Sequence, residues 1–210
     1  MTKDSRLRIG IFGGSFDPPH VAHSQLVTIT KNQFNLDRIY VVPSKFPPGK
    51  EPGATFEKRL EWTAEVFGQN PDLVISDLEG KSQTTVFGRE IFNQLSLLEP
   101  SAQFFWILGE DQLQRLSFWK EIDSYAAKLI WLVTPRSSGH YPSGLSSKRL
   151  GQSTCSYYWT KMAPMLEVAS HTIRESLIAE GEKSPQIQWI PEMIRKDVLE
   201  TYSKKQGSRR

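Results

Sequence analysis

The architecture of this chain follows from the stretch Gly13-Gly14-Ser15-Phe16-Asp17-Pro18-Pro19-His20-Val21-Ala22-His23. An apolar run, Ile9-Gly10-Ile11-Phe12, precedes it, and a helical pattern begins near Ala22. The order strand, glycine-rich turn and helix is typical of α/β proteins, where turn N–H groups and the positive end of the helix dipole bind an anion. His20 and His23 stand at i and i+3, which puts both on one face if the helix has already begun. Two imidazoles at such a turn indicate chemistry on a bound phosphate.

The glycine spacing argues against two other nucleotide-binding loops. Gly10, Gly13 and Gly14 do not fit the G-x-G-x-x-G pattern of dinucleotide-binding turns, and the G-x-x-x-x-G-K-S/T pattern of a P-loop is absent. A Rossmann dehydrogenase is therefore disfavoured. The plainer alternative is an ordinary tight turn with two surface histidines. Two of the four histidines in the chain stand here, three residues apart, which favours the functional interpretation.

Strand and helix patterns alternate along the rest of the chain. Short apolar runs predict strands at residues 8–12, 38–42, 73–75, 104–108, 128–133 and 165–168. Helical spacing predicts helices at residues 22–33, 55–67, 86–97, 169–178 and 190–202. No hairpin signal separates the strands, so we predict an α/β fold, a single-domain, Rossmann-like, doubly wound parallel sheet.

Length and composition fit one such domain, which we predict to span residues 1–203 of the 210. Residues 134–164 are rich in Ser, Gly and Pro, and we predict an irregular, mobile loop there. Residues 204–210 carry four basic side chains and are expected to form a disordered tail. The net charge of +3 is too small to indicate nucleic acid as a partner.

Other features bear on the compartment. Cys155 is the only cysteine, which excludes an intrachain disulfide and fits a reducing compartment. No apolar segment follows the N-terminus as in a secretory signal, and the apolar runs are far shorter than the ~20 residues that span a bilayer. We therefore expect a cytoplasmic protein with no membrane partner; the oligomeric state stays open.

Several polar residues follow predicted strands. Lys45 and Lys50 lie in a Pro/Gly-rich loop after the second strand, where we expect Lys45 to be solvated. Gly109 and Asp111 follow the strand at 104–108, where an acidic side chain can accept hydrogen bonds from ribose or cap the next helix. The cluster at residues 82–85 suits a helix N-cap. Trp119 is either a packing residue or an aromatic face for a flat ring.

Residues 14–23 resemble the G-x-F-D-P-x-H-x-G-H signature of the nucleotidyltransferase superfamily, which includes the nicotinate and nicotinamide mononucleotide adenylyltransferases and the pantetheine-phosphate adenylyltransferases. Ala22 stands where the signature has Gly. Residues 169–174 resemble a second signature, I-S-S-T-x-I-R, in which Ser170 and Arg174 match, whereas Ala169 and His171 depart from it. Residues 190–202 resemble the Ile-Pro-x-x-V-x-x-Y ending of bacterial nicotinate mononucleotide adenylyltransferases.

The resemblance implies roles for particular residues. The catalytic set that it implies is His20, His23, Lys50 and Arg174. The ATP-binding set is Gly13, Gly14, Ser15, Phe16, His20, His23, Lys50, Gly109, Asp111, Ser170 and Arg174. The set for the second substrate is Ser15, Thr84, Asp111 and Trp119. Thr84 lies in a segment similar to the family's Ser-Tyr-Thr-x-Asp, from which Gln83 and Val86 depart.

The implied activity is adenylyl transfer from ATP to nicotinate mononucleotide, with ATP and a pyridine mononucleotide as partners. No Asp/Glu pair stands out as a metal-ligand set, so the implied Mg²⁺ would be held largely by ATP and water. Nicotinamide mononucleotide and phosphopantetheine are alternative substrates. A non-catalytic nucleotide-binding sensor is an alternative from another class.

Overall fold

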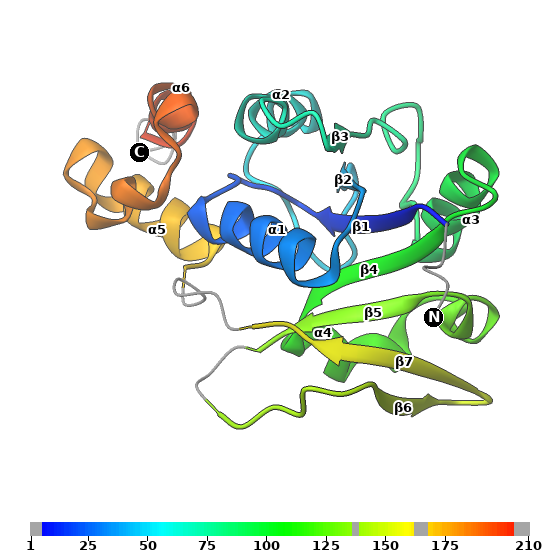
Figure 1. Cartoon of the computed structure of the whole chain (residues 1–210). Coiled ribbons are helices and arrows are strands. Elements are labelled where there is room, and N and C mark those ends of the chain that lie inside the picture. The colour runs from blue at the N-terminus through cyan, green and yellow to red at the C-terminus, as the bar shows by residue number, and fades with distance from the viewer. Residues whose placement is uncertain (1–5, 136–138, 162–167, 204–210) are drawn as a thin grey trace.

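The computed structural model describes residues 6–135, 139–161 and 168–203. Within these residues, seven strands form one sheet in the order β3-β2-β1-β4-β5-β7-β6, which runs from top to bottom in Figure 1. The strands are β1 Arg8–Gly14, β2 Arg38–Pro43, β3 Leu73–Ile75, β4 Gln103–Gly109, β5 Ile130–Thr134, β6 Ser146–Leu150 and β7 Ser153–Trp159.

Six α-helices connect or follow the strands of the described chain: α1 Val21–Phe34, α2 Phe56–Phe67, α3 Gly88–Leu98, α4 Glu110–Arg115, α5 Ser170–Glu180 and α6 Glu192–Ser203. Short 3₁₀ turns follow α4, at Leu116–Phe118, Ile122–Ser124 and Ala126–Lys128, and two more, Gly181–Lys183 and Pro185–Trp189, join α5 to α6.

All strand pairs are parallel except β6 with β7. Strand order reverses between β1 and β4, and ligands of doubly wound sheets bind outside the carboxyl ends of the strands at such a point. The glycine-rich turn after β1 lies there. The predicted α/β, Rossmann-like, doubly wound single domain is therefore confirmed.

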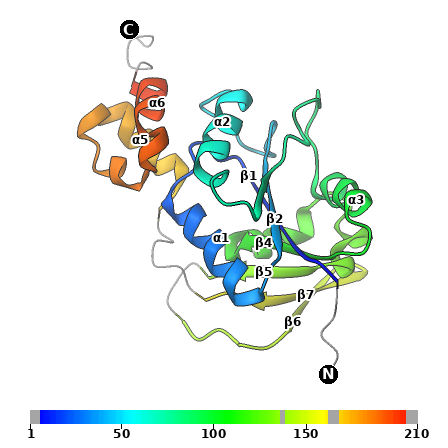
Figure 2. The ribbon, with the colours of Figure 1, turned by 45° about the horizontal axis from the view of Figure 1, so that its top comes forward.

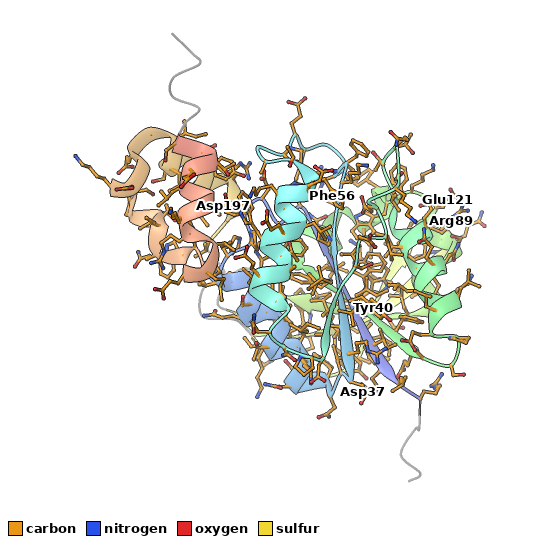
Figure 3. The ribbon with its side chains drawn as sticks, turned by 90° about the horizontal axis from the view of Figure 1, so that it is seen from above. Asp37, Tyr40, Phe56, Arg89, Glu121 and Asp197 are labelled. Carbon is orange, nitrogen blue, oxygen red and sulfur yellow. The ribbon has the colours of Figure 1, made fainter. Side chains whose placement is uncertain are left out.

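Each face of the sheet has its own core. Val27 of α1 and Phe67 of α2 pack on one face, whereas Leu95 of α3 and Leu113 of α4 pack on the other. A third apolar cluster, built around the buried side chains of Trp62, Ile173 and Val198, joins α2 to α5 and α6. Figure 2 shows α5 and α6 together beside α2, and Asp197 is labelled on α6 in Figure 3.

The prediction of an irregular loop over residues 134–164 is wrong for residues 146–159. Residues 146–159 form a hairpin in which β7 pairs parallel with β5 and antiparallel with β6. Cys155, Tyr157 and Trp159 alternate toward one core, a period-2 signal that the serine-rich composition hid. Gly151, with a φ of 56°, is the first of two residues between the paired Leu150 and Ser153, and a glycine in such a turn is a hairpin signal.

Two smaller predictions also change. The cluster at 82–85 does not cap a helix, because α3 begins at Gly88 with Phe87 as its N-cap. Residues 165–167 of the strand predicted at 165–168 lie outside the described residues, as do residues 136–138, 162–164 and the tail 204–210. No helix in the described ranges is long and apolar enough to cross a membrane.

The hairpin turn generates a test of the fold. We expect Gly151→Val to lower the free energy of unfolding by about 1–3 kcal/mol, because a β-branched residue is strained at positive φ. Gly144→Val is the matched control, since a Cβ at Gly144 meets nothing within 4 Å and its φ is not positive. Urea unfolding measures both. Equal stability of the two variants would contradict the hairpin.

Candidate active site

The side chain of Phe16 packs beneath the backbone of its own turn, the turn after β1. Phe16 has a φ of 47° and its ring is buried against Phe12 and His23, with centroid distances of 5.4 and 5.1 Å. A Cβ on Gly14 would lie 3.1 Å from the Phe16 ring, so glycine permits this close approach. Phe16 can therefore face a nucleotide only through its backbone, whereas the backbone N–H groups of such turns are natural anion ligands.

The two signature histidines stack on each other at the start of α1. Their ring centroids are 3.7 Å apart and their planes differ by 29°. His20 is the N-cap with extended backbone rather than a helical residue, so the stacking comes from the cap geometry and not from two helical positions. His20 N donates to His23 Nδ1 at 3.1 Å. A neutral imidazole that accepts at Nδ1 carries its proton on Nε2, so His23 presents Nε2–H as a donor.

Asp17 was given no role from the sequence, yet it joins the signature turn to the loop before α2. Its buried carboxylate accepts from Gly53 N at 2.7 Å and from Ala54 N at 3.1 Å. The hydroxyl of Tyr202 on α6 also donates to it. Burial and the Asp17 carboxylate raise the pKa of Tyr202, so the hydroxyl keeps its proton and remains a donor.

Arg59 is a second residue that the sequence analysis missed. Its buried guanidinium donates to Ser15 O and Ser44 O, both at 2.6 Å, and to Ala54 O at 3.3 Å. It therefore ties the turn after β1 to the turn after β2. Burial lowers the pKa of Arg59, but guanidinium is basic enough to keep its charge. The available signal was an arginine on the buried face of α2, three residues from both Phe56 and Trp62.

Of the two lysines in the loop after β2, Lys45 departs from the prediction. Lys45 is not solvated: its Nζ donates to Gly80 O at 2.7 Å and to Ser82 O at 2.9 Å. The buried carboxylate of Glu79 accepts from Ser44 Oγ and Lys45 N. Burial raises the pKa of Glu79. Lys50 is exposed after Gly49, whose φ is 67°. Lys50 is thus the lysine of this loop available to a ligand.

The second signature contacts the first directly. Ser170, the first residue of α5, donates from Oγ to Pro18 O at 2.9 Å. Arg174 Nη1 donates to Asp17 O at 2.5 Å and lies 3.3 Å from Asp17 Oδ2. The Arg174 side chain keeps 23% of its exposure. The structure therefore brings Ser170 and Arg174 to the turn that carries His20 and His23, as the two signatures imply.

Of the residues implied for the second substrate, Ser15 lies in the turn after β1, where its carbonyl accepts from Arg59. Asp111 and Trp119 lie on the side of the sheet that α3 and α4 cover. Gly109 is the N-cap of α4 and Asp111 lies in its first turn, where Asp111 Oδ2 accepts from Gln112 Nε2. The half-buried Trp119 ring meets Trp106 and Trp131 edge to face, at 5.6 and 5.9 Å. Trp119 thus has a packing role whatever it binds.

Thr84 is exposed and lines a hollow of about 700 Å³. Six of the residues around this hollow are Ser82, Thr84, Val86, Phe87, Glu90 and Lys120. Thr84 N donates to Ser82 Oγ at 3.2 Å, and Lys120 Nζ lies 4.6 Å from the centroid of the Phe87 ring. Trp119 is not among the lining residues, although its neighbour Lys120 is.

The donors available for a metal ion are few. Among the residues that the structure describes, no group of three His, Cys, Asp or Glu side chains could hold an ion.

Comparison with known proteins identifies the family of this chain. Residues 11–176 match the model of the cytidylyltransferase-like family. The chain is 34% identical over 195 residues to the probable nicotinate-nucleotide adenylyltransferase of Thermotoga maritima, which covers 91% of this chain and 90% of that protein. It is 28% identical over 197 residues to the protein of that name from Exiguobacterium sibiricum, with 92% and 97% covered.

The fold has a solved counterpart. The Plasmodium falciparum nicotinic acid mononucleotide adenylyltransferase complexed with NaAD superposes with a TM-score of 0.73 at 20% identity, over 93% of this chain and 95% of that one. This chain belongs to the cytidylyltransferase-like family of nucleotidyltransferases, and within it to the nicotinate-nucleotide adenylyltransferases.

Arg59 gives the test of this site. We expect Arg59→Met to lower the free energy of unfolding by about 3–5 kcal/mol, because the carbonyl oxygens of both turns lose their buried donor. Arg149→Met, at an exposed position on β6, should change it by less than about 0.5 kcal/mol. Denaturant unfolding followed by tryptophan fluorescence compares them, and near-equal values would contradict the role of Arg59.

Proposed function

We propose that the chain transfers the adenylyl group of ATP to nicotinate mononucleotide, forming nicotinate adenine dinucleotide and pyrophosphate for NAD biosynthesis. The observation that carries this proposal is the stacked His20–His23 pair at the switch point of the sheet, with Arg174 of the second signature brought to the same turn. The relatives' names supply the identity of the acceptor.

In this reaction an oxygen of the mononucleotide phosphate attacks the α-phosphorus of ATP, and the bond to the bridging oxygen of pyrophosphate breaks. The attacking group is already an anion, so no protein nucleophile is needed. Catalysis then depends on positioning and on stabilising negative charge in the transition state. His23 Nε2–H would donate to an oxygen of the α-phosphate, and His20 would hold the His23 ring through their stacking.

Other residues would bind the nucleotide. Backbone N–H groups of the turn at residues 13–16 and the N-terminus of α5, which begins at Ser170, would contact phosphate oxygens. Arg174 and the exposed Lys50 would bind the β- and γ-phosphates. Gly109 and Asp111 would lie against a ribose. Mg²⁺, when bound, would neutralise triphosphate charge, and it would be held mainly by phosphate oxygens and water.

The hollow beside Thr84 would take the pyridine mononucleotide, with Trp119 giving an aromatic face at its border. Lys120 would attract the carboxylate of the acid form. A carboxylate lacks the two N–H donors of a carboxamide. Protein donors around this group would therefore form hydrogen bonds with both oxygens of the acid, but would face the NH₂ donor of the amide. We therefore expect nicotinate mononucleotide to be preferred over nicotinamide mononucleotide.

The direct test is pyrophosphate release from ATP with nicotinate mononucleotide, nicotinamide mononucleotide or phosphopantetheine. The proposal requires the largest kcat/KM with nicotinate mononucleotide. A larger value with either other acceptor would reassign the substrate. No release with any of them, together with ATP binding, would favour a nucleotide sensor.

His23 gives the sharpest prediction about chemistry. We expect His23→Ala to lower kcat by about 10²–10³-fold while the KM for ATP changes little, because the lost hydrogen bond strengthens in the transition state. Thr28→Ala, on the exposed side of the same helix, should keep the activity of the unaltered protein. Steady-state kinetics with varied ATP give kcat and the KM for ATP of both variants. A His23→Ala protein with near-normal kcat would remove the catalytic role.

A further inference from the structure

The Asp17 carboxylate collects donors from three other parts of the chain. Gly53 and Ala54 donate backbone N–H groups to it, Arg174 of α5 forms an ion pair with it at 3.3 Å, and Tyr202 of α6 donates its hydroxyl. Asp17 itself lies three residues before His20. One buried carboxylate thus connects the histidine turn, the loop that carries Lys50, and both C-terminal helices.

Tyr202 reaches this carboxylate from 185 residues away. Its ring is buried beside Trp62, with centroids 6.1 Å apart. A Cβ on Gly53 would lie 2.8 Å from Tyr202 Cε1 and 3.2 Å from Arg174 Cδ. Glycine at 53 therefore lets the tyrosine and the arginine close over the backbone whose N–H groups bind Asp17.

The hydroxyl of Tyr202 is not the main anchor of α6. Asp197, five residues earlier on the same helix, accepts from Trp62 Nε1 at 2.7 Å and pairs with Lys58 Nζ at 2.8 Å. Ile194 and Val198 bury their side chains in the same interface. These contacts hold α6 on α2 without the hydrogen bond from Tyr202 to Asp17. That hydrogen bond can therefore serve a purpose other than docking the helix.

We propose that Tyr202 is a positioning residue for adenylyl transfer: it fixes the Asp17 carboxylate, which sets the placement of the histidine turn, the loop after β2 and Arg174. This inference rests on the proposed function. In this role Tyr202 acts on the reaction through Asp17. Helix α6 would thus be part of the active-site framework.

Tyr202→Phe tests the proposal, because it removes the hydroxyl and keeps the ring that packs on Trp62. We expect kcat to fall about tenfold or more, since a displaced catalytic group costs rate steeply. The KM for nicotinate mononucleotide should stay within about twofold, because the pyridine end of that substrate is assigned to the hollow beside Thr84, away from Asp17. Assays are run well below the unfolding midpoint of each variant.

Asp197→Asn is the matched control on α6. It weakens the docking of the helix without touching Asp17, so it should lower the unfolding midpoint and leave kcat unchanged. Backbone hydrogen exchange gives a second readout that needs no activity. We expect the amides of Gly53 and Ala54 to exchange about tenfold faster or more in Tyr202→Phe and at the unaltered rate in Asp197→Asn.

Unchanged kcat in Tyr202→Phe, unchanged exchange at Gly53 and Ala54, or an equal loss of kcat in Asp197→Asn would overturn the positioning role. Failure of the proposed function is distinguishable from this, because it would appear as no pyrophosphate release by the unaltered protein.

Discussion

A buried carboxylate needs hydrogen-bond donors, and the donors to Asp17 fix the arrangement of the segments around the candidate active site. An unpaired charge at that depth would be strongly destabilising. The chain meets the demand with N–H groups from the loop before α2, the Arg174 guanidinium and the Tyr202 hydroxyl. Each donor belongs to a different segment, so satisfying one side chain fixes the relative positions of all of them. The same arrangement places the second signature against the first.

Arg59 is a buried charge of the opposite sign that also joins separate segments. A buried guanidinium needs acceptors, and it finds them on the backbone of both βα turns. Glu79 then holds the turn after β2 from its other side. Loops rich in glycine and proline would otherwise be the least defined parts of an α/β protein. Here buried charges hold them, which suits a reaction that depends on placing phosphates rather than on a protein nucleophile.

Local signals in the sequence predicted the β1–turn–α1 unit, the parallel sheet and most helices, because strand and helix periods and helix-start chemistry act over a few residues. The roles of Asp17 and Arg59 could not be predicted in this way, since their partners lie up to 185 and 44 residues away. The prediction of a solvated Lys45 is wrong for the same reason: its acceptors, Gly80 O and Ser82 O, come from the segment after β3. The β6–β7 hairpin was missed because polar residues on the sheet edge masked the alternation of Cys155, Tyr157 and Trp159.

The central claim is that Asp17 and Tyr202 act as one unit, and a double-mutant cycle on kcat measures this most directly. Asp17→Asn, Tyr202→Phe and the double variant are compared with the unaltered protein under conditions where all are folded. If the two residues act through their shared hydrogen bond, the double variant should be no more than about twofold slower than Asp17→Asn alone, because coupled residues give non-additive effects. Losses that multiply across the two substitutions would contradict the account.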